Sequence, residues 1–284
     1  MHLCNWWIIN MGIITLISDM GIKDHAVAVV KGAIYSQLPG AVIVDISHSV
    51  SPFDTNHAAM MLRHTYHEFP KGTIHVIGVN PDVSAEIPHL VVEYNGHYFI
   101  GADNGVFSLI FDKTPDAIYE LNLDWEADEL TFPVRTIFVR AACHLARGGT
   151  PEVIGKQIPD IRQAERFRPL TEANALRGHV THIDRYGNAH TNITYQLFRE
   201  VGKGREFYIQ FRRRTFDIRK ISAHYNNVPE GEKVAIFNHS KVLEIAINKG
   251  TEGNGGGAAR LFNLSINSVV RIQFNENKDS QNGL

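Results

Sequence analysis

Residues 12–48, GIITLISDMGIKDHAVAVVKGAIYSQLPGAVIVDISH, decide the fold of the first half of the chain. An apolar strand pattern at 12–18 precedes an amphipathic stretch at 24–38, and a proline–glycine pair separates that stretch from a second apolar strand pattern at 41–45. Short apolar runs of this kind read as buried strands, and the longer amphipathic stretch reads as a helix. A strand, a helix and a strand in this order are typical of an α/β layer with a largely parallel sheet.

The alternation continues along the first half of the chain. The same patterns predict a helix over 54–69, a third strand over 73–79 and a helix over 136–147. The dipeptide Asn95-Gly96 between two apolar runs predicts a β-hairpin. We therefore predict Rossmann-like layers with a largely parallel sheet in this half.

The second half of the sequence has a different pattern of apolar and turn residues. Turn residues separate short β-rich runs, and helical periodicity is weak; the runs are at 178–183, 207–211, 233–238 and 268–274. This pattern is typical of an antiparallel barrel or sandwich. We predict an α/β domain over residues 11–176 and an all-β domain over residues 177–275.

The composition is that of a globular protein. The 284 residues are 44% hydrophobic and 20% charged, with a formal net charge of -2. Such a chain has no overall field that attracts nucleic acid or an anionic membrane, and no apolar run approaches the roughly 20 residues of a membrane helix. Cys4 and Cys143 are too few for a disulfide framework. We expect a cytoplasmic protein with neither nucleic acid nor membrane as a partner. Residues 1–10 lack the basic start of a signal peptide, and we interpret them as an extension or the product of an upstream start.

Other kinds of site are poorly supported. No glycine-rich dinucleotide or P-loop signature follows a strand. Among the fifteen histidines, His64 and His67 have helical spacing and His182 lies two residues before Asp184, but neither pair has a third ligand at a recognisable spacing. We therefore predict no metal site. The basic and aromatic segment FRRRTF at 211–216 is short and isolated, and we interpret it as a solvated strand edge.

Polar residues follow the predicted strands of the first half. The segments are Ser18–Gly21, Asp45–His48, Asn80–Asp82 and Gly101–Gly105. Because ligands of open α/β sheets lie beyond the carboxyl ends of the strands, these segments indicate one shared cleft. A carboxylate such as that of Asp19 can accept both hydrogens of a vicinal diol, as in a ribose. Asp, Asn and Ser also serve as ordinary caps and turn formers, which is the alternative reading.

Two further polar segments lie in the second half. His182–Asn188 follows a predicted strand, and Asn238–Lys241 precedes the apolar run 242–246. These segments read either as ligand-binding loops or as ordinary hairpin turns.

Seven motifs in order give the chain a resemblance to a known family. They are ISDMG (17–21), DISH (45–48), FPKGTIHVIGVNP (69–81), DNG (103–105), TF..R.IF..AA.HLA.G (131–148), IDRYGN..TNI (183–193) and S..LEIA.N.G (240–250). From about Gly12 to Phe274 the chain resembles the S-adenosyl-L-methionine (SAM) hydroxide adenosyltransferases, relatives of the fluorinase and chlorinase enzymes. The resemblance implies an α/β domain, a C-terminal β-barrel and a homotrimer with inter-subunit sites. It implies no cofactor, with SAM itself as substrate or ligand.

The resemblance also assigns ligand-binding roles by position. Asp19 would hold the ribose hydroxyls, Phe53 would line the sugar pocket, Asp184 and Ser240 would bind the methionine amino-acid end, Asn188 would meet adenine and Tyr225 would stack on it. Stacking on an aromatic ring contributes roughly 1–3 kcal/mol per base. The implied reaction is attack of water on C5′ of the sulfonium, which gives adenosine and methionine.

The chain departs from the family at the groups that handle water. The hydrolases carry Asp, Arg and His there, and this chain has Asn80, about Ile87, and Pro133. A carboxamide orients water but accepts no proton at neutral pH, and proline has no side-chain donor. The glycine-rich insert at 252–257 also lies close to where the family's backbone recognises adenine.

Neighbouring residues are candidates to replace the lost groups. Asp82, Glu86 and His89 share the loop of Asn80, and Arg135 remains from the motif that begins at Thr131. We predict Asn80, Asp82 and Arg135 as the catalytic set. The alternatives are a non-catalytic protein that binds or senses SAM or adenosine, and an enzyme that uses another nucleophile such as chloride.

Overall fold

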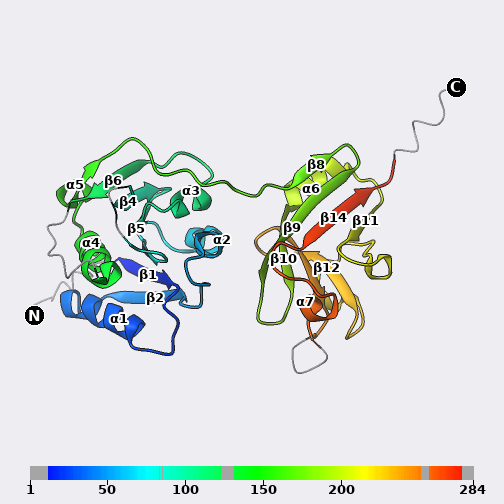
Figure 1. The fold of residues 1–284 in the computed structure, drawn as a ribbon, viewed down its shortest axis with the longest axis horizontal. Helices are drawn as coiled ribbons and strands as arrows, with labels where there is room; N and C mark the ends of the chain where they lie inside the picture. The colour runs from blue at the N-terminus through cyan, green and yellow to red at the C-terminus, as the bar shows by residue number, and fades with distance from the viewer. Residues whose placement is uncertain (1–11, 83, 85, 123–130, 251–255, 277–284) are drawn as a thin grey trace, which may run out of the picture. The chain divides into compact units, whose positions relative to one another are not determined.

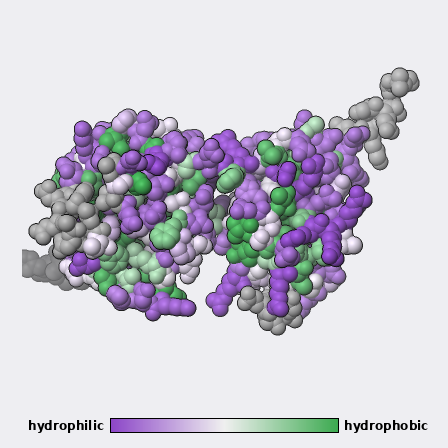
Figure 2. Space-filling model, viewed as in Figure 1, coloured by the Kyte–Doolittle hydropathy of each residue, from purple (hydrophilic) through white to green (hydrophobic). Residues whose placement is uncertain are grey.

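The computed structural model describes residues 12–82, 84, 86–122, 131–250 and 256–276. The chain forms two compact units, Met1–Glu165 and Arg166–Leu284, which are treated separately below (Figure 1). The predicted extension at 1–10 and residues 252–255 of the glycine-rich insert lie outside the described residues. Hydrophilic side chains cover most of the visible surface of each unit, and apolar side chains gather there only in small groups (Figure 2).

The N-terminal unit contains a seven-stranded mixed sheet in the order β2-β1-β3-β5-β4-β6-β7. Its strands are β1 (Ile13–Ser18), β2 (Val42–Ser47), β3 (Ile74–Gly78), β4 (His89–Tyr94), β5 (His97–Ala102), β6 (Ala117–Leu121) and β7 (Gly155–Gln157). Strands β2, β1, β3 and β5 are parallel, whereas β4 pairs antiparallel with β5 and β6, and β6 pairs antiparallel with β7. The expected largely parallel sheet is therefore corrected to a mixed one. The predicted hairpin is confirmed, and Asn95 and Gly96 turn it with φ of 52° and 79°.

Helices cover both faces of this sheet. They are α1 (Ala26–Gln37), α2 (Thr55–Thr65), η1 (Tyr66–Glu68), α3 (Val106–Ile110), η3 (Val134–Phe138), α4 (Val139–Ala146) and α5 (Pro151–Ile154). Buried residues of α1, η3 and α4 form one apolar core with β1 and β3, and those of α2 and α3 form the other. The helix predicted over 136–147 begins as a π-helical turn and continues as α4. Among the described residues, the helices lack the length and apolarity that crossing a membrane requires.

The C-terminal unit is one antiparallel sheet in the order β11-β14-β9-β10-β13-β12, with β8 beside β9. Its strands are β8 (Leu170–Glu172), β9 (Ala175–Ile183), β10 (Ala189–Thr194), β11 (Phe207–Gln210), β12 (Lys233–Phe237), β13 (Val242–Ile247) and β14 (Val269–Phe274). Its helices are α6 (Tyr195–Gly202), η4 (Arg214–Phe216), η5 (Tyr225–Asn227) and α7 (Ala258–Leu261). Ile218 forms a bridge to β11 and Ile221 forms one to β12, so one short segment contacts both edge strands. The expected barrel or sandwich is corrected to a single sheet curled as half a barrel around its own apolar core (Figure 1).

Candidate functional site

The polar strand ends of the N-terminal unit lie at one edge of the sheet, because β1, β2, β3 and β5 run parallel. The loops that follow β1 and β2 are joined by backbone hydrogen bonds. Gly21 N donates to His48 O at 2.8 Å, and Val50 N donates to Ser18 O at 3.4 Å. These two loops are therefore in direct contact, and a cleft shared by all four strand ends stays a prediction.

Asp19 and Phe53 are brought together by this arrangement. The backbone N–H of Phe53 donates to Oδ2 of Asp19 at 2.9 Å. Phe53 has a left-handed backbone with φ of 63°, and its side chain is 71% exposed. A non-glycine residue in this conformation costs of the order of 1–3 kcal/mol, and such strain gathers at functional sites. The backbone of a residue with an exposed aromatic ring thus holds a carboxylate that keeps further lone pairs.

A series of contacts between polar side chains supports the same strand ends. The Ser18 hydroxyl lies 2.7 Å from Nδ1 of His48, Nε2 of His48 lies 3.1 Å from Asp45, and Lys31 donates to the other oxygen of Asp45 at 2.6 Å. Ser18 and His48 are buried, whereas Asp45 is exposed. Burial acts to raise the pKa of Asp45, but its contacts with Lys31 and His48 outweigh burial and hold that pKa below its ordinary value.

The third and fourth strand ends are joined by Asn104. Its Nδ2 donates to Val79 O at 3.1 Å and to Asn80 O at 2.9 Å. Asn80 is half-buried with φ of 46°, a conformation that asparagine adopts more readily than most residues. Asp82 is exposed two residues later.

The predicted catalytic set is not joined by direct contacts. Arg135 is exposed on η3, next to the buried segment Pro133–Val134. Within the part of the chain that the structure describes, no hydrogen bond or ion pair links the side chains of Asn80, Asp82 and Arg135. Their catalytic roles stay predictions.

His89 is the buried member of the same loop. Its Nε2 donates to Pro81 O at 2.8 Å, and its ring packs edge-on against Phe138 with centroids 4.8 Å apart. Burial lowers the pKa of this imidazole. Among the described residues, its Nδ1 has no hydrogen-bond partner. His89 therefore stays neutral and fastens the loop that carries Asn80.

In the C-terminal unit, Asp184 organises the turn between β9 and β10. Its Oδ1 accepts from Tyr186 N and Asn188 N, both at 2.9 Å, and its Oδ2 accepts from the Asn188 side chain at 3.0 Å. Burial acts to raise the pKa of Asp184, but His190 and these hydrogen bonds hold it below its ordinary value. The predicted pair Asp184 and Asn188 is thus in direct contact.

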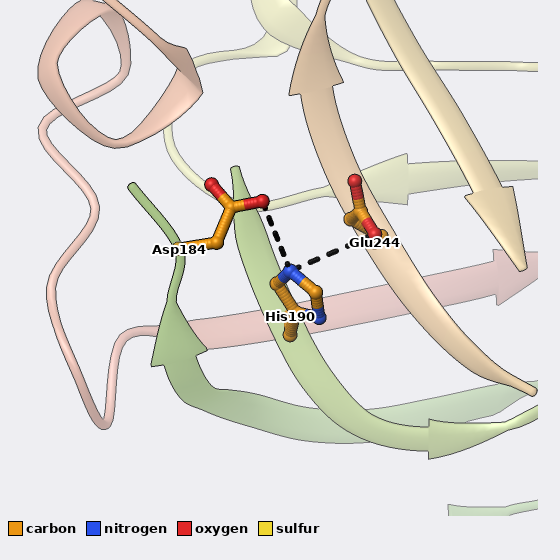
Figure 3. A group of neighbouring side chains, drawn as sticks. All are labelled: Asp184, His190 and Glu244. Carbon is orange, nitrogen blue, oxygen red and sulfur yellow. Dashed lines mark ion pairs between the residues drawn. The ribbon is translucent and has the colours of Figure 1, made fainter. Parts of the chain in front are cut away.

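Glu244 joins Tyr225 to this cluster. Figure 3 shows His190 Nε2 between two carboxylates, 3.5 Å from Asp184 and 3.6 Å from Glu244. The Tyr225 hydroxyl donates to the other oxygen of Glu244 at 2.6 Å. Burial and this bond raise the pKa of Tyr225, whose ring stays 40% exposed. An exposed ring with an anchored hydroxyl is suited to stacking.

Ser240 lies in the turn before β13, outside these contacts. Its hydroxyl is 3.0 Å from Nε2 of His239, and Lys241 N donates to Asn238 O at 2.9 Å to close the turn. The side chain of Asn238 reaches the cluster, where it donates to Glu244 at 3.1 Å. Ser240 is therefore two residues from the cluster without touching it.

The sequence analysis missed His190 and Glu244. They lie on β10 and β13, which pair with His190 opposite Glu244. No spacing rule reveals a pairing between strands so distant in sequence. The only available signal was the polar character of two residues within otherwise apolar strands.

Asp184, His190 and Glu244 are also the residue types that hold metals, and one ligand atom from each lies within 4.8 Å of the others. The orientation of Asn238 opposes that use. Its Nδ2 donates to Glu244, its Oδ1 accepts from Val242 N at 3.4 Å, and Nδ2 also donates to Nδ1 of His190 at 3.0 Å. The imidazole proton therefore lies on Nε2, where a metal would need a lone pair.

Comparison with known proteins covers both units. The family model of the SAM hydroxide adenosyltransferase N-terminal domain matches residues 14–155, and that of the C-terminal domain matches residues 178–271. The chain is 32% identical to an (R)-S-adenosyl-L-methionine hydrolase of Thermus thermophilus over 83% of this chain and 91% of the relative. It is 29% identical to a fluorinase of Nocardia brasiliensis over 68% of this chain and 74% of the relative.

A solved structure is similar as well. The crystal structure of an uncharacterized conserved protein from Thermotoga maritima matches with a TM-score of 0.81 and 25% identity, covering 92% of this chain and all of the other. The similarity thus extends over the fold of nearly the whole chain.

Proposed function

Because the chain belongs to the SAM hydroxide adenosyltransferase family, we propose that it binds SAM and cleaves it with water at C5′ to adenosine and methionine. The leaving group is a neutral thioether, so no general acid is required. The enzyme must align water with C5′, which is worth roughly 7–11 kcal/mol in well-oriented systems, and must remove one proton.

The observation that carries the proposal is the pairing of Asp19 with Phe53 at the strand ends. The carboxylate keeps lone pairs for the ribose hydroxyls, and the exposed ring provides an apolar wall for the sugar. The cluster of Asp184, Asn188 and Tyr225 supports the same ligand. It supplies a carboxylate for the methionine amino group and an exposed ring for adenine.

Direct assay of the purified protein tests this proposal. Incubation with SAM should release adenosine and methionine in equal amounts, and chromatography measures both products. Asp19→Ala should abolish the release, whereas Asp160→Ala, which removes an exposed carboxylate of the same unit, should match wild type. Release by Asp19→Ala at the wild-type rate would contradict the proposed site. A chloride-containing reaction run in parallel should give no chlorinated nucleoside if water is the nucleophile.

A second candidate is a protein that binds SAM or adenosine without cleaving it. The observation that favours it is the presence of Asn80, Ile87 and Pro133 where the hydrolases carry their water-handling groups. Calorimetry would then show saturable binding of SAM with no product after prolonged incubation. Product formation above the Asp19→Ala background would exclude this candidate.

We also propose that the protein is a homotrimer, which rests on the family resemblance. Light scattering coupled to size-exclusion chromatography measures the mass directly. A mass three times the 31.9 kDa of the chain supports the proposal, and a monomer or dimer contradicts it.

A further inference from the structure

Hydrolysis of a sulfonium releases a proton that some group must accept. The oxygen of water forms a bond to C5′, the C5′–S bond breaks, and its electron pair stays on sulfur as the thioether of methionine. The new hydroxyl of adenosine retains one hydrogen of the water, and the other must leave. Asn80, Ile87 and Pro133 offer no basic atom for it.

A hydroxyl, an imidazole and a carboxylate are aligned at the end of β1. The Ser18 hydroxyl lies 2.7 Å from Nδ1 of His48, and its oxygen also accepts from the backbone N–H of Met20 at 3.4 Å. Because a carboxylate only accepts, Asp45 beside Nε2 favours the tautomer of His48 in which Nδ1 accepts the Ser18 hydrogen. Nε2 of His48 then carries the ring proton and faces Asp45 at 3.1 Å. Lys31 neutralises the other oxygen of Asp45. Among the described residues Nε2 of His48 makes no hydrogen bond, so its approach to Asp45 is electrostatic, and the contact between Ser18 and His48 is the hydrogen bond along which a proton can pass.

A small cavity adjoins the first member of this chain. Its volume is about 10 Å³, the size of one water molecule, and apolar atoms make up nearly all of its lining. It is lined by Leu16, Ile17, Ser18, Met20, Val27, Val30, His48, Val76 and Val134. Ser18 and His48 are its polar lining residues.

The cavity lies beside the positions where the family handles water. Val134 follows Pro133 in the chain and packs against Gly78, where an added Cβ would lie 3.0 Å from a methyl group of Val134. Gly78 ends β3, two residues before Asn80, and Asp19 is the residue after Ser18. Among the described residues at this edge of the sheet, Ser18, His48 and Asp45 are the one series of hydroxyl, imidazole and carboxylate. It begins next to Asp19, the carboxylate expected to bind the ribose.

We propose that Ser18, His48 and Asp45 accept the proton of the attacking water, an inference that rests on the proposed hydrolysis. As water attacks C5′, its proton passes to Oγ of Ser18 while the Ser18 hydrogen passes to Nδ1 of His48. The resulting imidazolium is stabilised by the carboxylate of Asp45. Ser18 returns to its starting state, and His48 later releases the proton to solvent through the exposed Asp45.

Three variants test the relay in the intact protein. His48→Gln, Ser18→Ala and Asp45→Asn each interrupt it, and Asp45→Asn alters an exposed side chain. His67→Gln, which changes an exposed histidine of the same unit, is the matched control. General-base catalysis contributes about 10²–10⁴-fold, so kcat of His48→Gln should fall at least a hundredfold. Its Kd for SAM by calorimetry should stay within twofold of wild type, and its residual kcat should rise in proportion to hydroxide concentration.

The outcomes separate this inference from the proposed function. Absence of turnover by the wild-type protein overturns both. Wild-type turnover together with unchanged kcat in His48→Gln and Asp45→Asn overturns the relay alone. A parallel loss of kcat and SAM affinity, without a new dependence on hydroxide, shows that His48 only holds the loop and also overturns the relay.

Discussion

The hydroxyl of Tyr225 donates a 2.6 Å hydrogen bond to Glu244, whose carboxylate is buried to 1% exposure. The bond fixes the ring expected to stack on adenine, and it also satisfies one oxygen of a buried anion. Asn238 donates to the other oxygen at 3.1 Å. Glu244 therefore fixes the position of the Tyr225 hydroxyl, and with it the ring for which we propose a stacking role.

Removing the hydroxyl of Tyr225 and removing its whole ring are expected to have separable effects. Tyr225→Phe keeps the stacking ring but leaves Glu244 with one fewer donor, so we expect a loss of about 1–3 kcal/mol in the free energy of unfolding and a modest rise in KM for SAM. Tyr225→Ala should raise KM further, because the ring itself is lost. Urea denaturation and steady-state kinetics measure the two quantities. Equal KM values for the Phe and Ala variants would show that the ring does not contact ligand.

Phe53 is predicted to lower the free energy of unfolding and to increase the affinity for SAM. Glycine adopts its φ of 63° without strain, so Phe53→Gly should keep or increase the free energy of unfolding by up to about 1 kcal/mol while weakening SAM binding severalfold. Asn95→Gly is the matched control, since it relieves φ of 52° in the β4–β5 hairpin, far from the strand ends that carry Asp19. It should leave the Kd for SAM unchanged. Unchanged SAM affinity in Phe53→Gly would remove Phe53 from the site.

A buried histidine pair makes stability depend on pH. The Thr15 hydroxyl lies 2.7 Å from Nδ1 of His75, and Nε2 of His75 lies 3.3 Å from His97. Burial, followed by the neighbouring His97, lowers the pKa of His75 to about 3. The folded state thus resists a proton that the unfolded chain takes up at its ordinary value of 6.5, so stability is complete above that pH and declines as pH falls toward 3.

The slope expected from this residue is roughly 0.7 kcal/mol per pH unit between pH 7 and 6 and approaches about 1.4 kcal/mol per pH unit at lower pH. Guanidinium denaturation at pH 7, 6 and 5 measures it. His75→Gln, whose amide can still accept from Thr15 but does not titrate, should flatten the dependence. A slope in His75→Gln as steep as that of wild type would assign the effect to other groups.

The sequence predicted the proximity of the loops after β1 and β2 better than the pairing of the sheet around them. Polar residues after the ends of parallel strands meet at one edge by geometry, so Asp19 and His48 could be placed together without coordinates. Periodicity predicts strands but not their direction of pairing, which is why the antiparallel β4, β6 and β7 were not foreseen. The hairpin at Asn95-Gly96 was predictable because its turn chemistry is local.

The C-terminal cluster shows the limit of such reasoning. Asp184 and Asn188 could be recognised because both belong to one turn. His190 and Glu244 depend on the register of β10 against β13, which no short-range pattern determines. Polar residues within apolar strands are the signal to examine in such cases.

Asn80→Asp is the most direct test of whether the chain retains a hydrolytic site. The substitution places a carboxylate where the resemblance to the SAM hydrolases implies one, and aspartate tolerates φ of 46° about as well as asparagine. The hydrogen bond from Asn104 is made to the backbone carbonyl of residue 80 and should persist.

The effect of Asn80→Asp on kcat depends on whether the site lacks an acceptor for the proton of water. If the weak step in water attack is proton removal, a carboxylate at residue 80 should raise kcat for SAM hydrolysis at least tenfold with little change in KM. Combination with His48→Gln then distinguishes two routes for the proton. If the carboxylate of Asn80→Asp replaces the relay, it should rescue most of the kcat that His48→Gln loses. If His48→Gln lowers kcat by the same factor with and without Asn80→Asp, His48 serves a step other than proton removal.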